Sequence, residues 1–228
     1  MDATATHIPP EVPSLSSKRN RDRELIRYVG RHGAVSIEHV MAALRMGRTV
    51  AYRRVAVLIE AGFLARLSLL HAEPSLLCAT RAGLRYAGLG LSPAPVSPGS
   101  VDHYLRCAST AQLLAEEFGA ERILMERELV MWERIEAKPI ASARLGERRL
   151  HRPDLAVFDE AGTIAIEVEL SAKAPRRLAA IMRGWRRASW VAGVRYYCAA
   201  GAARRAVERA VLKTHSGERV SVFEVLPR

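Results

Sequence analysis

Apolar residues in the first ninety positions recur every three or four residues, which is typical of amphipathic helices. A short stripe over residues 25–29 predicts a first helix, and Ser36 has the side chain of a good N-cap for a second helix. A third helix is expected from 48 to 61, because Gly62 follows it. Its inward stripe is expected to comprise Val50, Ala51, Val55, Leu58 and Ile59.

Two short apolar segments follow the third helix, at 63–67 and 76–80, and the proline-containing stretch 71–74 separates them. Such a pair predicts a β-hairpin. Residues 81–89 are expected to form a closing helix. Three helices followed by a hairpin are typical of the winged helix, a variant of the helix-turn-helix.

Prolines and serines interrupt this pattern in two places. Residues 1–18 are rich in Pro, Ser and Thr without periodicity, which predicts a disordered arm. Residues 91–100 contain three prolines and three serines and are expected to be a linker. The predicted organisation is a winged-helix domain over 19–90, the linker over 91–100 and a second domain over 101–228.

The second domain mixes helical and alternating patterns. A helix is expected to run from about Tyr104 to Phe118, because Gly119 ends the apolar repeat. Strands are predicted at 126–134, 155–158, 163–170, 194–198 and 220–225, and helices at 175–190 and 202–214. This order predicts an α/β (α+β) fold of the αβββαβ type with a central mixed sheet.

The strand at 163–170 carries the candidate chemistry. Ile164, Ile166, Val168 and Leu170 fall on one face, whereas Glu167 and Glu169 fall on the other face. Two carboxylates on one face of a central strand repel each other, and burial makes either one costly to ionise. A bound cation or paired arginines would offset that cost.

Asp154 adds a third carboxylate at the start of the preceding strand, and the turn at 159–162 makes the two strands neighbours. Asp154, Glu167 and Glu169 are therefore expected to converge on Mg²⁺, which prefers carboxylate oxygens. In the alternative without metal, Arg152 or the arginines of the 175–190 helix would neutralise the two glutamates. Glu116 or Glu117 of the first helix could add a metal ligand, while His103 and His151 are candidates for phosphate contacts.

The segment RPDLAVFDEAGTIAIEVELSAK resembles the signature of PD-(D/E)XK nucleases: Pro-Asp, a spacer of twelve residues, then Glu-x-Lys or another polar residue. The resemblance implies that Asp154 and Glu167 hold Mg²⁺. The chain departs from the usual pattern because Glu169 replaces the lysine, and Lys173 is a displaced candidate. In that case Glu169 or Lys173 would orient or deprotonate the attacking water.

The winged-helix pattern continued by this nuclease-like pattern is similar to the replication-relaxation family of bacterial plasmids and mobile elements. The phrases RPDLAVF, IAIEVELSAK and RYY carry that resemblance. It implies a DNA-binding protein in replication or transfer control. In winged helices the third helix enters the major groove, and here its outward positions are expected to include Arg48, Thr49, Tyr52, Arg53 and Arg54.

Net charge supports a polyanionic partner. The chain carries a formal charge of +11 with a pI of about 10.3, and we expect double-stranded DNA rather than a membrane as its partner. Cys78, Cys107 and Cys198 are too far apart for a disulfide framework or a zinc site and are expected to be reduced core residues. A cytoplasmic location is expected, and a homodimer would suit paired half-sites.

Three functions follow from these patterns. The first is a sequence-directed DNA-binding protein of a plasmid or mobile element. The second is a Mg²⁺-dependent DNA endonuclease guided by its winged helix, and the third is a transcriptional regulator with an inactive nuclease-like domain. The sequence contains no Walker-type glycine-rich loop and no Gly-x-Gly-x-x-Gly following a strand, which argues against nucleotide-binding enzymes.

Overall fold

A computed structural model of the chain describes residues 18–69, 75–146 and 149–225. The chain divides into two compact units between Ser109 and Thr110. This boundary lies inside a helix, several residues beyond the expected linker at 91–100. The predicted arm at 1–18 lies outside the described residues except for Lys18, and the predicted turn at 71–74 lies outside them too.

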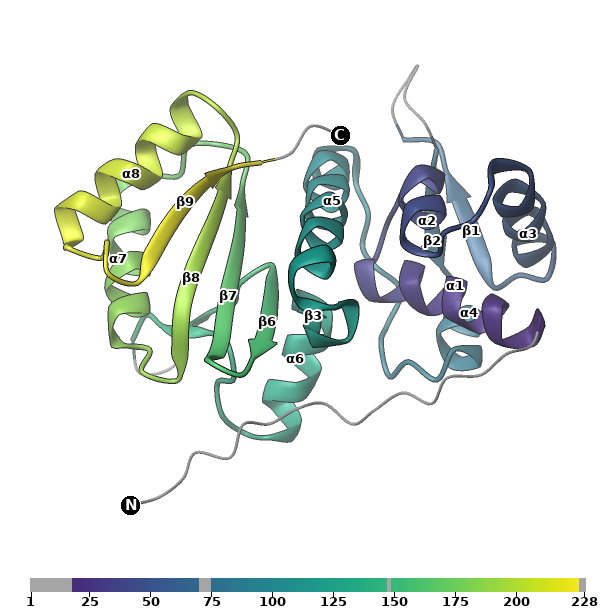
Figure 1. Ribbon diagram of the computed structural model, residues 1–228, viewed down its shortest axis with the longest axis horizontal. Coiled ribbons are helices and arrows are strands. Elements are labelled where there is room, and N and C mark those ends of the chain that lie inside the picture. Colours follow the sequence, from purple (N-terminus) through teal and green to yellow (C-terminus); the bar gives the residue numbers. More distant parts are fainter. Residues whose placement is uncertain (1–17, 70–74, 147–148, 226–228) are drawn as a thin grey trace. The chain divides into compact units, whose positions relative to one another are not determined.

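The first unit has three helices followed by a two-stranded antiparallel sheet, as the sequence predicted (Figure 1). Its elements are α1 (Lys18–His32), α2 (Ile37–Ala43), α3 (Arg48–Glu60), β1 (Leu64–Leu67), β2 (Leu76–Ala79) and α4 (Arg81–Tyr86). The core joins Leu25, Ile26 and Val29 of α1 to Val55 and Leu58 of α3.

Local interactions explain where these helices begin and end. The Ser36 side chain accepts a hydrogen bond from the backbone N–H of His39, which confirms Ser36 as the N-cap of α2. Gly62 follows α3 with φ of 74°, a conformation that costs glycine little. The inward stripe predicted for α3 is partly wrong: Ala51, Val55 and Leu58 are buried, whereas Val50 is 42% exposed.

The second unit is built on a five-stranded mixed sheet in the order β3-β6-β7-β8-β9. β6 runs antiparallel to both of its neighbours, β3 and β7, whereas β7, β8 and β9 are parallel. The strands are β3 (Ile123–Met125), β6 (Leu155–Asp159), β7 (Gly162–Glu169), β8 (Val191–Cys198) and β9 (Val220–Glu224), and the short strands β4 (Ala143–Arg144) and β5 (Leu150–His151) form a separate pair. The predicted central mixed sheet is confirmed, with β7 in its middle.

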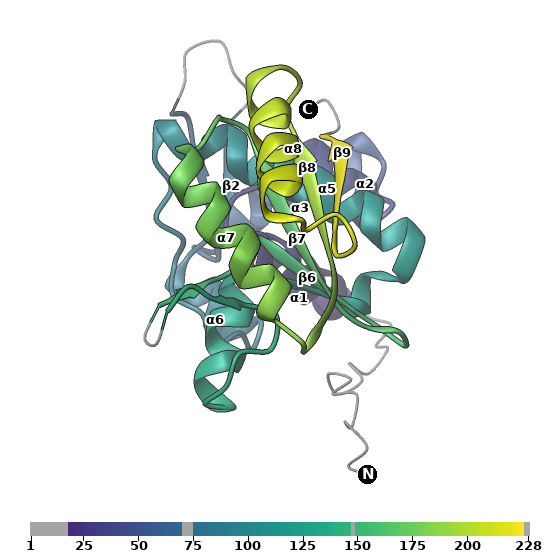
Figure 2. The same ribbon diagram turned by 90° about the vertical axis from the view of Figure 1, so that its left-hand side faces the viewer.

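Helices cover both faces of this sheet (Figures 1 and 2). They are α5 (Val101–Phe118), α6 (Glu126–Ile135), α7 (Pro175–Arg187) and α8 (Ala202–Thr214), and the short 3-10 turns η1 (Pro98–Ser100) and η2 (Ala120–Arg122) flank α5. Trp185 of α7 and Val207 of α8 pack with Tyr196 of β8 in one core. Arg195, which alternates with Tyr196, instead bonds Glu117 in the last turn of α5.

The strand predicted at 126–134 is wrong, because this segment forms α6. A strand, β3, is found only in the three residues before this segment. The Glu128 side chain accepts from the Met125 backbone N–H and so satisfies a donor at the start of the helix. Leu129 then packs with Leu124 and Phe158, so tertiary contacts decide the outcome of an ambiguous apolar pattern.

Candidate functional site

The exposed face of α3 is basic and aromatic. Arg48, Thr49, Tyr52 and Arg53 are all exposed, and the Arg48 guanidinium lies 5.6 Å from the centre of the Tyr52 ring. Arg54, predicted to face outward with them, is half-buried and forms a 3.0 Å ion pair with Asp22 of α1. Its role in the fold is therefore to join α3 to α1.

The two glutamates of β7 are buried in the middle of the second unit's sheet. Glu167 and Glu169 are each 3% exposed, and they share a face with Ala165, which packs beneath α7. Asp154, just before β6, accepts a 2.7 Å hydrogen bond through Oδ2 from the Val168 backbone N–H. Asp154 therefore lies beside β7, the strand that carries both glutamates.

His151 is the nearest partner of Glu167. Its Nε2 lies 2.6 Å from Glu167 Oε1, and its ring lies edge-on to the Trp185 indole at 5.7 Å between centroids. Burial raises the pKa of Glu167 above its ordinary value, and the charge of Asp154 acts in the same direction. The imidazole opposes both effects, as expected of a group that stabilises the carboxylate.

Glu169 has a different partner. Lys173 forms an ion pair with Glu169 from four residues farther along the chain. Burial by itself would lower the pKa of Lys173, but its hydrogen bond to Glu169 and the charges of Glu167, Glu169 and Asp154 raise it overall. Lys173 therefore stands as a cation beside the acidic group, where the sequence placed a displaced lysine.

Tyr196 is a member of the site that the sequence did not reveal. It lies beside Glu167 in the β7–β8 register, and its buried hydroxyl accepts a 3.3 Å hydrogen bond from Trp185 Nε1. Burial, together with the charges of Glu167 and Glu169, raises the pKa of this phenol well above its ordinary value. Strand pairing was the only signal that could have identified it.

The alternative neutralisation by arginine is wrong in its details. Arg152 donates from Nε to Glu133 of α6, at 3.1 Å, rather than to either glutamate of β7. Glu133 Oε1 also accepts from the backbone N–H groups of Ile140 and Ser142. A histidine and a lysine, rather than arginines, partner the β7 glutamates.

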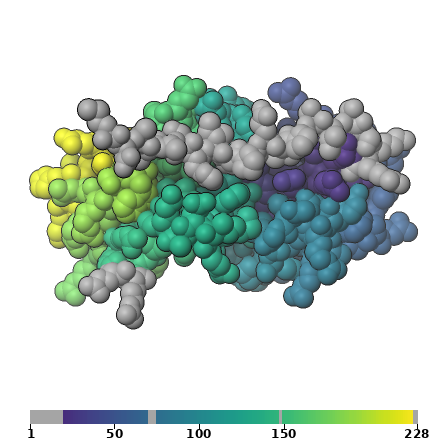
Figure 3. Space-filling model, turned by 90° about the horizontal axis from the view of Figure 1, so that it is seen from below, coloured from purple at the N-terminus to yellow at the C-terminus, as the bar shows by residue number. Residues whose placement is uncertain are grey.

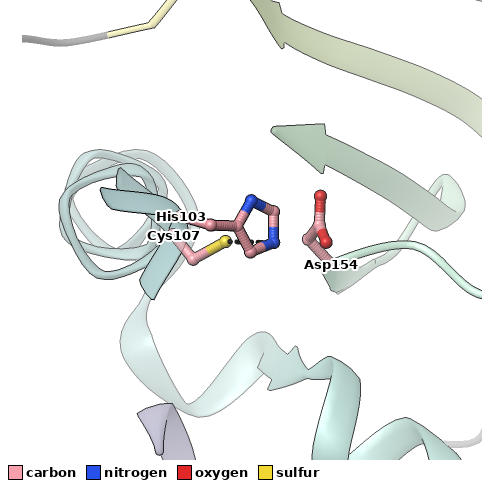
Figure 4. Close-up of side chains that lie close together, drawn as sticks. All are labelled: His103, Cys107 and Asp154. Atoms are coloured by element: carbon pink, nitrogen blue, oxygen red, sulfur yellow. Dashed lines mark hydrogen bonds between the residues drawn. The ribbon is translucent and has the colours of Figure 1, made fainter. Parts of the chain in front are cut away.

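The other predicted candidates have contacts of their own. Glu116 and Glu117 are both exposed, and Glu117 accepts two hydrogen bonds from Arg195. His103 Nε2 lies 3.5 Å from the Cys107 thiol one turn along α5, and Figure 4 draws both side chains as well as Asp154. Cys78, Cys107 and Cys198 are buried and form no disulfide bond, as predicted.

The carboxylates fit a hard divalent ion in donor type. Asp154, Glu167 and Glu169 offer only oxygens, the ligands that Mg²⁺ prefers. In the described structure, however, His151 contacts Glu167 and Lys173 pairs with Glu169. A metal held by all three carboxylates would compete with these two partners.

Comparison with known proteins gives no family. No protein-family model and no curated protein matches the chain. Among solved structures, the chain is similar to an O-methyltransferase family protein from Burkholderia thailandensis, with 14% identity and a TM-score of 0.21. The match covers 93% of this chain and 65% of the methyltransferase-family chain. This chain therefore spans less than two thirds of the length of that protein. None of the described helices is both long and apolar enough to cross a bilayer.

Proposed function

We propose that this protein binds double-stranded DNA through α3, as the recognition helix of a winged-helix domain. The exposed group Arg48, Thr49, Tyr52 and Arg53 carries this proposal. Guanidinium and hydroxyl groups on one helix face can contact phosphates and base edges together. The element order of the first unit supports it, because α2 and α3 precede a two-stranded sheet.

Anisotropy of a short labelled duplex tests the proposal. Arg48→Gln with Arg53→Gln should weaken binding about tenfold or more at moderate salt and flatten its dependence on salt, because each lost phosphate contact lowers the slope by about 0.9. Arg81→Gln with Arg134→Gln is the matched control, since both side chains are exposed and lie outside α3. Equal affinity of the two double variants would refute the role of α3.

A second candidate function, Mg²⁺-dependent DNA cleavage, is favoured by the buried acidic group beside Lys173. Asp154 and Glu167 would hold the ion, which when bound would lower the pKa of a coordinated water. Lys173, as a cation, would bind a phosphate oxygen, and Glu169 would orient Lys173 through their ion pair. Tyr196 and Trp185 would keep one side of the group dry.

Nicking of supercoiled plasmid, measured across Mg²⁺ and Mn²⁺ concentrations, tests this second function. Glu167→Ala should abolish metal-dependent nicking, while Glu218→Ala, which removes an exposed carboxylate, should leave it unchanged. Calorimetric titration of each metal should show binding that Glu167→Ala weakens. Intact duplex binding with neither metal binding nor nicking would leave a DNA-binding regulator with an inactive nuclease-like domain.

The biological setting of the proposal is replication or transfer control of a plasmid or mobile element. The support is the resemblance of the RPDLAVF and IAIEVELSAK segments to the replication-relaxation family. A homodimer would let two copies of α3 read paired half-sites. Sedimentation with and without a palindromic duplex would test the dimer.

A further inference from the structure

Helix α7 is the most strongly basic element of the second unit. Its sequence PRRLAAIMRGWRR contains five arginines and no acidic residue. The apolar side of the helix buries Leu178, Ile181, Met182 and Trp185 against the sheet, so all five arginines lie on its exposed side. The DNA-binding role proposed for α3 does not explain this concentration of charge.

The neighbouring helix extends the basic surface. α7 and α8 pack side by side over the same face of the sheet (Figure 2). Arg205, Arg209 and Lys213 of α8 are exposed at intervals of four residues, which places them along one side of that helix. Residues beyond 200 are seen at the surface in Figure 3. The single acid of α8, Glu208, is hydrogen-bonded by Arg204.

Some of these arginines have structural roles, and others do not. Arg186 donates to the Thr214 carbonyl and Arg187 donates to the Arg144 carbonyl. In the part of the chain that the structure describes, no acidic side chain pairs with Arg176, Arg177 or Arg183. Like charges this close repel, and a polyanion would relieve that repulsion.

We infer that the exposed face of α7 and α8 binds the sugar–phosphate backbone of duplex DNA, as a second contact in addition to α3. From Arg176 to Arg187 the helix rises about 16 Å, enough to meet several phosphates along one groove edge. Arginine forks suit phosphate oxygens. This inference rests on the proposed function only for the identity of the polyanion, since the surface belongs to the second unit.

The position of α7 links this surface to the acidic site. β7 ends at Glu169, Lys173 follows, and α7 begins at Pro175. Arg176 and Arg177 are in the first turn of α7. They therefore lie at the N-terminal end of this helix, directly after the Glu169–Lys173 pair in the chain. A backbone bound along α7 would bring a phosphate toward that end.

The test uses the full chain and a short labelled DNA duplex of random sequence. Arg176→Gln, Arg177→Gln and Arg183→Gln together should weaken binding about tenfold or more and reduce the slope of log affinity against log salt by about two. A matched triple variant, Arg81→Gln, Arg85→Gln and Arg134→Gln, removes the same charge from exposed positions outside α7 and α8. Its slope should stay within about half a unit of the parent slope.

Three outcomes decide the inference. Equal effects of the two triple variants would overturn it, because net charge alone would then explain the loss. A variant with Arg176→Lys, Arg177→Lys and Arg183→Lys keeps the charge and should keep most of the binding that the glutamine triple loses. Equal loss in the lysine and glutamine variants would contradict a phosphate contact. Tighter binding of duplex RNA than of duplex DNA, lost in the glutamine triple, would overturn the assignment to DNA.

The α3 variants separate this inference from the proposed function. Loss of binding in Arg48→Gln with Arg53→Gln, but not in the α7 triple, would refute the second contact alone. Loss in the α7 triple, but not in the α3 variant, would refute the role of α3 and leave the second contact standing.

Discussion

His151 Nε2 and Glu167 Oε1 lie 2.6 Å apart inside the second unit, with Glu167 almost fully buried. The pair joins β5, which belongs to a separate two-stranded sheet, to the central strand β7. The imidazole satisfies an oxygen that water does not reach. This contact therefore fixes the segment leading to Asp154 against the acidic face of the main sheet.

Removing His151 should destabilise the protein for this reason. His151→Ala leaves the Glu167 carboxyl without its partner, and we expect a loss of about 1–3 kcal/mol in the free energy of unfolding. Urea denaturation followed by Trp fluorescence would measure it. Combining His151→Ala with Glu167→Leu should cost less than the sum of the single changes, because the unpaired carboxyl is then gone. Strict additivity would contradict the pairing.

The ion pair between Lys173 and Glu169 predicts a second stability effect. Lys173→Met leaves a 3% exposed carboxylate without its counter-ion, and we expect destabilisation of about 2 kcal/mol. Lys213→Met, on the exposed side of α8, is the matched control and should change stability by less than about 0.5 kcal/mol. Similar unfolding midpoints for the two variants would show that Glu169 does not depend on Lys173.

His32 predicts that the first unit loses stability in acid. Its Nδ1 donates to the Tyr28 carbonyl at 2.8 Å, and burial lowers its pKa from 6.5 to about 3. Between these values the unfolded chain binds a proton that the folded chain does not. Stability is therefore fully present above pH 6.5 and falls by at most about 1.4 kcal/mol per pH unit below it.

His32→Phe provides the comparison, because the phenyl ring can keep the contact with Tyr28 and cannot be protonated. As pH falls from 7 to 4, the parent should lose more unfolding free energy than His32→Phe does. Urea denaturation at each pH would measure both. A constant difference over this range would mean that His32 does not titrate on unfolding.

Gly83 predicts a steric effect at the start of α4. A Cβ at this position would lie 2.0 Å from the Phe63 carbonyl oxygen, which already accepts the backbone N–H of Thr80. Gly83→Ala should therefore destabilise the protein by about 1–3 kcal/mol or more, despite the better helix propensity of alanine. Gly99→Ala is the control, because nothing lies within 4 Å of its added Cβ. Thermal melting would show equal midpoints if the close approach were absent.

Most of the element order follows from patterns in the sequence. Helical periodicity placed α1, α2 and α3, and strand parity placed Glu167 and Glu169 on one face of β7. These patterns depend on residues close together in the chain, where the period of the backbone repeats directly in the side chains. The same reasoning failed for α6, because its short apolar pattern fits a strand or a helix and the packing of Leu129 decided between them.

Tertiary structure alone decided the partners of the charged residues. His151 meets Glu167 across 16 positions, Arg152 turns to Glu133, and Arg54 turns to Asp22. No local pattern specifies such pairs, because a buried carboxyl is stabilised by whichever donor the folded chain brings within reach. Lys173 lies only four residues beyond Glu169 and was a candidate from the sequence, but its ion pair with Glu169 was not predicted.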